Sequence, residues 1–142
     1  MNNSGSGLTG APTVNVFVTG QPGVGKTSLV LNVAKKLPQH AIAGFYTVEA
    51  KAEGTGERLG LDVVTLNGET APLCRLRRGC GPKVGKYYVA LDDFERVVLP
   101  TLTPRENVKL HVIDEVGRMG LCSQKFTEAV LNLLSSPSAV RF

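Results

Sequence analysis

The sequence contains no tryptophan, and its 142 residues include only three cysteines and two histidines. An odd and sparse set of cysteines does not suit a disulfide-rich secreted domain and favours a reducing compartment. Cys74 and Cys80 have no histidine close to them in the sequence, so no zinc site is expected. No apolar run approaches the roughly 18 residues of a membrane helix. The first residues lack the basic start and apolar core of a secretory signal. We therefore expect a cytoplasmic protein with no membrane partner.

The composition is that of one globular domain. Hydrophobic residues make up 42% of the chain and charged residues 20%, which excludes a disordered chain. We expect a flexible tail over residues 1–13 and a single domain, monomeric, over residues 14–142. The net charge of +4 suits a protein that handles anions. It does not distinguish nucleic acid from compact polyphosphates.

Strand signals recur along the chain. Residues 14–19 and 108–114 are short apolar runs typical of buried strands. Residues 44–50 and 58–66 are rich in β-branched and aromatic side chains and flank a stretch with two glycines, which predicts an antiparallel hairpin. The basic segment 73–86, broken by glycine and proline, is expected to be a loop.

Helix signals lie between these strands. Residues 26–37 predict a helix that ends before Pro38, with an apolar face formed by Leu29, Val30, Val33 and Leu37. Residues 87–99 predict a strand that runs into a helix, with Asp92 as N-cap and Glu95 completing a capping box. Ser123 is expected to cap a last helix, whose apolar face would comprise Phe126, Ala129, Val130, Leu133 and Leu134.

These elements predict an α/β fold with a mostly parallel sheet, flanking helices and one antiparallel hairpin as an insertion. The final residues, AVRF, have the character of the first residues of a further strand. We expect that the last strands of the domain are missing from this chain.

The most specific motif is G-x-x-x-x-G-K-[ST], which Gly20, Gly25, Lys26 and Thr27 satisfy between a predicted strand and a predicted helix. Glycines let phosphate oxygens approach backbone amides at a helix N-terminus. Lys26 is expected to reach the β- and γ-phosphates and the Thr27 hydroxyl to ligate Mg²⁺. The structural alternative is a glycine turn before an ordinary helix. The predicted phosphate-binding loop comprises Gly20, Gln21, Pro22, Gly23, Val24, Gly25, Lys26, Thr27 and Ser28.

A second group of candidate residues ends the predicted strand 108–114. The carboxyl ends of parallel strands meet at the ligand crevice of an α/β sheet. Asp114 is expected to hold Mg²⁺ directly or through a water, and Glu115 to orient or deprotonate an attacking water. The alternative is that both acids begin a solvated loop.

Basic and aromatic residues elsewhere leave alternatives open. Arg58, at the base of the hairpin, is either an arginine finger on the γ-phosphate or a solvated charge. Arg75, Arg77 and Arg78 could form a lid over a nucleotide or touch nucleic acid, but a solvated loop is favoured because no aromatic residues are interleaved with them. Tyr87 and Tyr88 are expected in a strand rather than stacked on a base, and His111 in the core.

In order and spacing, the segments GQPGVGKTSL, GFYTVEAK, GERLGLDVVTL, VGKYYV and VIDEVGRM resemble the THEP-type nucleoside-triphosphatases, from about residue 14 to the last residue. The resemblance implies a RecA-like P-loop fold. It also implies a Mg²⁺-dependent hydrolase that removes the γ-phosphate of ATP, GTP and other nucleoside triphosphates with little base preference. It further implies that the nucleotide site is lined by residues 20–27 together with Leu110, His111, Val112, Ile113, Asp114, Glu115, Val116 and Gly117.

The chain departs from the family pattern at three places. Gly120 stands where the family usually has glutamate, so any role of that carboxylate is missing. Lys51 stands where the family has arginine, and lysine lacks the bidentate fork. Family members also continue beyond this chain's end with further strands and part of the base pocket. Two alternatives to hydrolysis therefore stay open: a small nucleotide or nucleoside kinase, and a non-catalytic nucleotide-binding module.

Overall fold

The computed structural model of the chain describes residues 15–21, 23–76, 81–114, 116–135 and 140–141. The predicted tail over residues 1–13, as well as Pro22, Arg77, Arg78 and Glu115, lies outside the described residues. No helix in the described part has both the length and the apolar character needed to cross a membrane.

A seven-stranded sheet forms the centre of the described structure, with strand order β4-β5-β3-β2-β1-β6-β7. Antiparallel pairings join β4 to β5, β5 to β3, β3 to β2 and β2 to β1, whereas β1–β6 and β6–β7 are parallel. The strands are β1 (Ile42–Lys51), β2 (Arg58–Thr65), β3 (Thr70–Arg75), β4 (Lys83–Val84), β5 (Tyr87–Val89), β6 (Leu110–Ile113) and β7 (Val140–Arg141).

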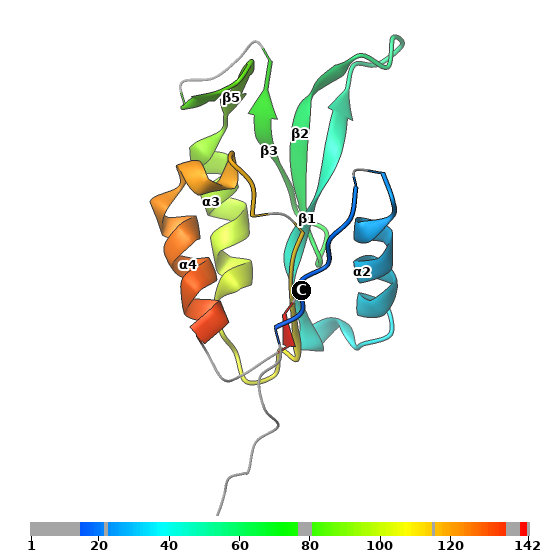
Figure 1. The fold of residues 1–142 in the computed structure, drawn as a ribbon, viewed down its shortest axis with the longest axis vertical. Helices are drawn as coiled ribbons and strands as arrows, with labels where there is room; N and C mark the ends of the chain where they lie inside the picture. Colours follow the sequence, from blue (N-terminus) through cyan, green and yellow to red (C-terminus); the bar gives the residue numbers. More distant parts are fainter. Residues whose placement is uncertain (1–14, 22, 77–80, 115, 136–139, 142) are drawn as a thin grey trace, which may run out of the picture.

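Helices cover both faces of this sheet. Figure 1 shows α3 (Leu91–Val98) and α4 (Gln124–Ser135) on one face and α2 (Lys26–Ala34) on the other. Side chains alternate between the two faces along a strand. On β6, Leu110 and Val112 accordingly pack with Val30 and Ala34 of α2.

The larger core lies between the sheet and the helices α3 and α4. Its centre is a set of three rings, Phe45, Phe94 and Phe126, each at most 1% exposed. The ring centroids are 6.1, 6.0 and 5.1 Å apart, all in edge-to-face arrangements. Such geometry adds about 0.5–1.5 kcal/mol per pair to the burial of the rings. This core fixes the end of β1 that leads into the candidate site.

The α/β class with one hairpin is confirmed, but the sheet contains more antiparallel strand pairing than predicted. β1 is the antiparallel partner of β2 and also the parallel partner of β6. The hairpin is therefore part of the main sheet, and among the described residues antiparallel pairings outnumber parallel ones. Gly44 makes the β1–β6 contact possible. A Cβ at this residue, whose φ is +126°, would lie 1.9 Å from the Val112 carbonyl oxygen.

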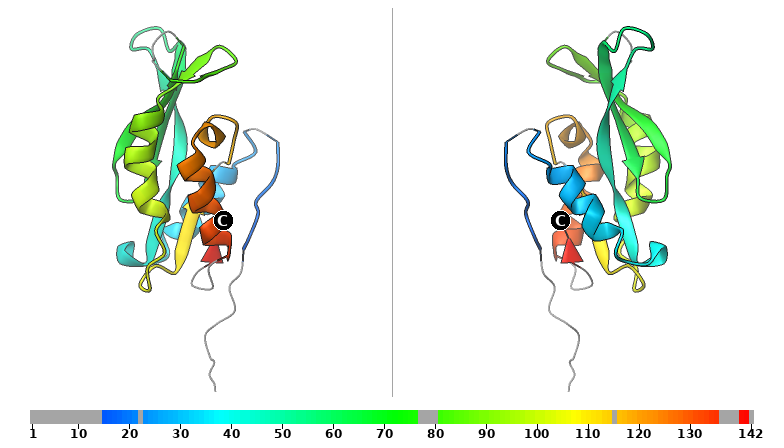
Figure 2. Two further views of the ribbon diagram at one scale, coloured as in Figure 1. Left: turned by 90° about the vertical axis from the view of Figure 1, so that its left-hand side faces the viewer. Right: turned by 90° about the vertical axis from the view of Figure 1, so that its right-hand side faces the viewer.

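The predicted strand over residues 14–19 is wrong for the residues that the structure describes. Only Asn15 has a sheet bridge, and Phe17 is 80% exposed. The strand β7 pairs with β6 only at Leu110 and His111. Among the described residues, residues 16–19 form no backbone ladder with any strand. Figure 2 shows this segment at the outer side of the structure, where half-buried Val18 packs against Val30 and Ala34 of α2 and Leu110 and Val112 of β6 without forming a strand.

The smaller predictions have mixed outcomes. Residues 73–86 were expected to be a loop, but the first three belong to β3, and Lys83 and Val84 form β4. The expected start of a strand at the end of the chain is confirmed as β7. Helix α2 ends at Ala34 because the amides of Lys36 and Leu37 bond to carbonyls three residues back, which tightens the last turn.

The caps of the two later helices differ in outcome. The predicted capping box of α3 is wrong: its N-cap is Ala90, which makes no side-chain cap. The helix starts early because β5 ends at Val89 and the Ala90 amide bonds to the Leu73 carbonyl. Ser123 caps α4 as predicted, since its hydroxyl accepts a hydrogen bond from the Phe126 amide at 3.0 Å.

Candidate active site

The predicted phosphate-binding loop forms a tight turn in front of α2. The Val24 amide donates to the Gln21 carbonyl at 3.2 Å, and Gly23 and Gly25 have φ angles of +81° and +103°. The Lys26 ammonium folds back and donates to the Gly20 carbonyl at 2.7 Å. Among the described residues, no side-chain hydrogen bond caps the N-terminus of α2. The first amides of the helix therefore remain available to an anion, which the helix dipole also favours.

Asp114 is the residue that connects this loop to the sheet. Its Oδ1 accepts a hydrogen bond from the Thr27 hydroxyl at 2.9 Å. Its Oδ2 accepts two from Thr47, from the amide at 3.0 Å and from the hydroxyl at 3.1 Å. The Asp114 amide donates to the Phe45 carbonyl at 3.2 Å and continues the β1–β6 pairing. The structure therefore brings together Thr27 and Asp114, which the sequence predicts as metal ligands.

Thr47 is a site residue that the sequence predictions missed. It lies on β1, where its backbone and side chain both hold the Asp114 carboxylate. The available signal was the segment GFYT, which supported the family resemblance but received no chemical role. A threonine in a strand is ordinarily explained by β propensity alone, so only the register of β1 against β6 shows its function.

Two cavities meet at Thr47. The first, here called the loop-side cavity, measures about 630 Å³ and lies between residues 15–18, the end of β6 and α4; Lys26, Thr27 and Asp114 line it. The second, here called the hairpin-side cavity, measures about 660 Å³ and lies between β1, β2, the β4–β5 turn, α3 and residues 117–120. Thr47 lines both, so they adjoin at the Asp114 carboxylate.

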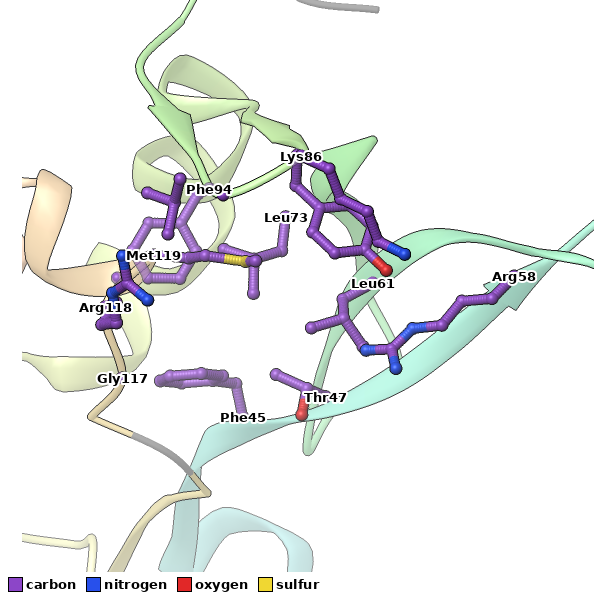
Figure 3. A pocket seen from close by; sticks show the side chains of 14 residues that line it. Phe45, Thr47, Arg58, Leu61, Leu73, Lys86, Phe94, Gly117, Arg118 and Met119 are labelled. Atoms are coloured by element: carbon purple, nitrogen blue, oxygen red, sulfur yellow. The ribbon is translucent and has the colours of Figure 1, made fainter. Parts of the chain in front are cut away.

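Arg58 lies in the hairpin-side cavity and not beside Lys26. Its guanidinium carbon is 5.8 Å from the centre of the Tyr87 ring. Figure 3 shows the side chain extending along β2 toward Thr47. Arg58 does not line the loop-side cavity, which Lys26, Thr27 and Asp114 line. Its role as an arginine finger stays a prediction.

The residues predicted around Asp114 separate into two groups. Leu110, His111 and Val112 are buried in the sheet and line neither cavity. They position Asp114 and have no surface for a nucleotide. Ile113 and Val116 line the loop-side cavity and Gly117 the hairpin-side cavity. Glu115 lies outside the described residues, and its role as the water-orienting base stays a prediction.

The remaining basic and aromatic candidates that the structure describes lie in strands of the sheet. Arg75 ends β3 and pairs with Asp62 at 2.7 Å, so it is held in the sheet and does not belong to a lid. Tyr87 and Tyr88 are strand residues of β5, as predicted. His111 is 0% exposed, in agreement with a core position.

The donor set at Thr27 and Asp114 fits a magnesium ion. Within the described residues, no three side chains of the histidine, cysteine, aspartate and glutamate types gather to hold a metal. Mg²⁺, however, is usually bound through one or two protein oxygens, with phosphates and waters completing its shell. A hydroxyl and a carboxylate within 2.9 Å of each other supply such oxygens.

Comparison with known proteins gives a consistent family. A family model described as NTPase matches residues 15–141. The cancer-related nucleoside-triphosphatase homolog of Mus musculus is 41% identical over 140 residues, covering 89% of this chain and 72% of its own length. The nucleoside-triphosphatase THEP1 of Thermotoga sp. (strain RQ2) is 40% identical over 128 residues, covering 89% and 71%.

Two solved structures resemble the fold. The solution structure of a human cancer-related nucleoside triphosphatase superposes with a TM-score of 0.71 at 38% identity, covering 92% of this chain and 74% of that one. The crystal structure of THEP1 from Aquifex aeolicus superposes with a TM-score of 0.72 at 29% identity, covering 91% and 74%. With its phosphate loop joined through Thr27 to Asp114, the chain belongs to the THEP-type nucleoside-triphosphatase family.

Proposed function

We propose that this protein hydrolyses nucleoside triphosphates to diphosphate and phosphate in a Mg²⁺-dependent reaction. One observation carries the proposal. Thr27 of the phosphate loop and Thr47 of β1 both donate hydrogen bonds of 2.9–3.1 Å to the Asp114 carboxylate; these three residues are here called the Thr27–Asp114 joint. A metal-binding hydroxyl and carboxylate stand beside a loop whose amides and lysine suit the phosphates. Family membership supports the same reaction.

The chain's own groups would act on the phosphates in a defined way. The uncapped amides at the start of α2 bind the phosphate oxygens, and Lys26 exchanges the Gly20 carbonyl for the β- and γ-phosphates. The Thr27 hydroxyl and the Asp114 carboxylate would hold Mg²⁺, which would supply positive charge to offset the negative charge of the phosphates. Glu115 orients the attacking water. These residues contact only the phosphates and the cation of a nucleotide. We therefore also propose that the enzyme accepts nucleoside triphosphates with different bases.

Phosphate release with and without Mg²⁺ tests the proposal, using ATP, GTP, CTP and UTP as substrates. The variant Glu115→Gln should bind nucleotide normally but turn over about a hundredfold more slowly, because the water loses its base. Glu128→Gln, on the exposed face of α4, is the matched control. A folded sample that releases no phosphate in the presence of Mg²⁺ would contradict hydrolysis and favour the non-catalytic alternative.

Two further proposals concern the location and the assembly state of the protein. Cys74 and Cys122 are free thiols, which supports a reducing, cytoplasmic location. We propose a monomer that contains one nucleotide site in residues 14–142. Sedimentation velocity of the full chain, with and without Mg²⁺ and nucleotide, measures the assembly state.

A further inference from the structure

The hairpin-side cavity adjoins the end of the phosphate loop at which the γ-phosphate belongs. Thr27 and Asp114 would hold the Mg²⁺ that neutralises the terminal phosphates of a bound triphosphate, so these phosphates would lie at the Asp114 end of the loop. Thr47 donates two hydrogen bonds to Asp114 and also lines the hairpin-side cavity. Gly117, three residues after Asp114, lines it as well. A molecule in this cavity therefore faces the γ-phosphate and not the base.

The floor of the cavity is apolar and rigid. Phe45 and Phe94 are 1% exposed and meet edge-to-face with 6.1 Å between their centroids. Leu61, Leu73 and Met119 complete the floor (Figure 3). A preformed apolar surface of this kind suits a flat ring, because the ring displaces water without forcing side chains to rearrange.

The rim of the cavity is cationic. Arg58, Lys86 and Arg118 line it, and among the residues that the structure describes its lining includes no aspartate or glutamate. None of the three cations forms an ion pair within the part of the chain that the structure describes. Figure 3 shows Arg58 and Arg118 on opposite sides of the cavity. Arg58 and Lys86 lie over the Tyr87 ring, 5.8 and 5.6 Å from its centroid, which leaves their positive charge in place. Cations gathered around a cavity concentrate anions there.

We propose that the hairpin-side cavity binds a phosphate monoester that carries a planar ring, such as a nucleoside monophosphate, as acceptor of the γ-phosphate. The ring lies against the half-buried side chains of Leu61 and Met119, which pack on the core that contains Phe45 and Phe94. The phosphate lies at the cationic rim. At about 660 Å³ the cavity is within the 300–1,000 Å³ range of small-molecule sites. This inference rests on the proposed nucleotide site and extends its chemistry from water to a second substrate.

The transfer step balances without an additional reactant. A phosphate monoester is mostly dianionic at neutral pH, because its second pKa is about 6. One of its oxygens forms a bond to the γ-phosphorus. The bond between that phosphorus and the β–γ bridging oxygen breaks, and its electron pair stays on the departing diphosphate. No proton needs to move, and the products are two diphosphates.

The test separates acceptor binding from hydrolysis. Isothermal titration of the full chain with AMP, GMP, CMP and UMP, in the absence of triphosphate, measures binding directly. Adenosine supplies the ring alone and ribose 5-phosphate the phosphate alone. We expect saturable binding of at least one monophosphate, with each fragment binding at least tenfold more weakly. Thin-layer chromatography with γ-labelled ATP then detects the labelled diphosphate.

Variants assign the binding to this cavity. Arg118→Gln should weaken monophosphate binding about tenfold or more while acceptor-free hydrolysis stays unchanged. Arg96→Gln, on the exposed outer face of α3, is the matched control. Lys86→Gln should weaken monophosphate binding in the same direction and gives a second, independent variant of an exposed cation on this rim.

Three outcomes would overturn the inference, and each differs from a failure of hydrolysis. The first is that no monophosphate binds although Mg²⁺-dependent hydrolysis is normal. The second is that monophosphate binding is unaffected by Arg118→Gln and Lys86→Gln but is displaced by a non-hydrolysable triphosphate, which places it in the phosphate loop. The third is binding without a labelled diphosphate. Absent hydrolysis with intact monophosphate binding would count only against the proposed function.

Discussion

Replacing Thr47 with valine removes one hydroxyl from the joint at Asp114 and keeps the β-branched shape that suits a strand. The lost contact is the 3.1 Å hydrogen bond to Oδ2; Asp114 retains the Thr47 amide at 3.0 Å and the Thr27 hydroxyl at 2.9 Å. Hydrogen bonds to charged groups contribute about 1.5–3 kcal/mol. Asp114 is half-buried and keeps two donors, so we expect a loss near the lower end, about 1.5 kcal/mol.

This loss has two measurable consequences. The melting temperature should fall by about 3–6 °C, since 1 kcal/mol corresponds to about 2–4 °C in domains of roughly this size. The carboxylate also becomes less well oriented. The Mg²⁺ concentration that gives half-maximal hydrolysis should therefore rise about tenfold, while kcat at saturating Mg²⁺ stays close to that of the unmodified protein.

The assay is a Mg²⁺ titration of phosphate release, combined with thermal unfolding followed by circular dichroism. Thr70→Val is the matched control because Thr70 is an exposed residue of β3, and Thr47→Ser should restore the Mg²⁺ dependence. The reasoning would be refuted if the Thr47→Val protein had the same melting temperature and the same Mg²⁺ dependence of hydrolysis as the unmodified protein. That result would mean that the side chain of Thr47 does not orient Asp114.

Three further predictions concern the loop, the sheet and a thiol. Lys26→Ala should abolish the binding of a fluorescent triphosphate analogue, whereas Lys125→Ala, at an exposed residue of α4, should leave binding unchanged. Gly44→Ala should destabilise the fold by more than about 3 kcal/mol in urea unfolding, because its Cβ would strike the Val112 carbonyl. Gly54→Ala, at a glycine that also has a positive φ (+85°) but open space around it, should cost only about 1 kcal/mol. Burial raises the pKa of the Cys74 thiol above its ordinary value of 9.0, so the stability that this thiol contributes is present below pH 9 and is lost as the pH rises through the folded-state value. Cys74→Ala should reduce that alkaline loss in pH-dependent unfolding, and a thiol reagent at neutral pH should label half-buried Cys122 before Cys74.

The sequence predicted those parts of the structure that local chemistry determines. The glycine spacing of the phosphate loop, the serine cap at Ser123 and the apolar face of α4 depend on neighbours within a few residues, and they are found where expected. Asp114 was found because it ends an apolar strand. Thr47 was not, because its partner lies 67 residues away and only the parallel register of β1 and β6 brings the two together.

The predictions that were wrong also depended on contacts between parts of the chain that are distant in sequence. Residues 14–19 have the composition of a buried strand, but a strand needs a ladder partner, and composition does not show whether one is present. Asp92 and Glu95 have the spacing of a capping box, but β5 leads directly into α3 and leaves no room for it. Glu95 instead accepts a hydrogen bond from the Ser123 hydroxyl, a contact between two helices.

The attachment of the phosphate loop to the sheet has a consequence for hydrogen exchange. Residues 16–19 lack a ladder in the described structure, and the loop is fastened through the Thr27–Asp114 side-chain bond and the packing of Val30 and Ala34. Amides in this segment should therefore exchange with solvent through a local opening that costs much less than global unfolding. A ligand that bridges the Thr27–Asp114 joint raises the cost of that opening by mass action. Slower exchange over residues 16–20 should consequently report the occupancy of the site, even in a variant that no longer turns over.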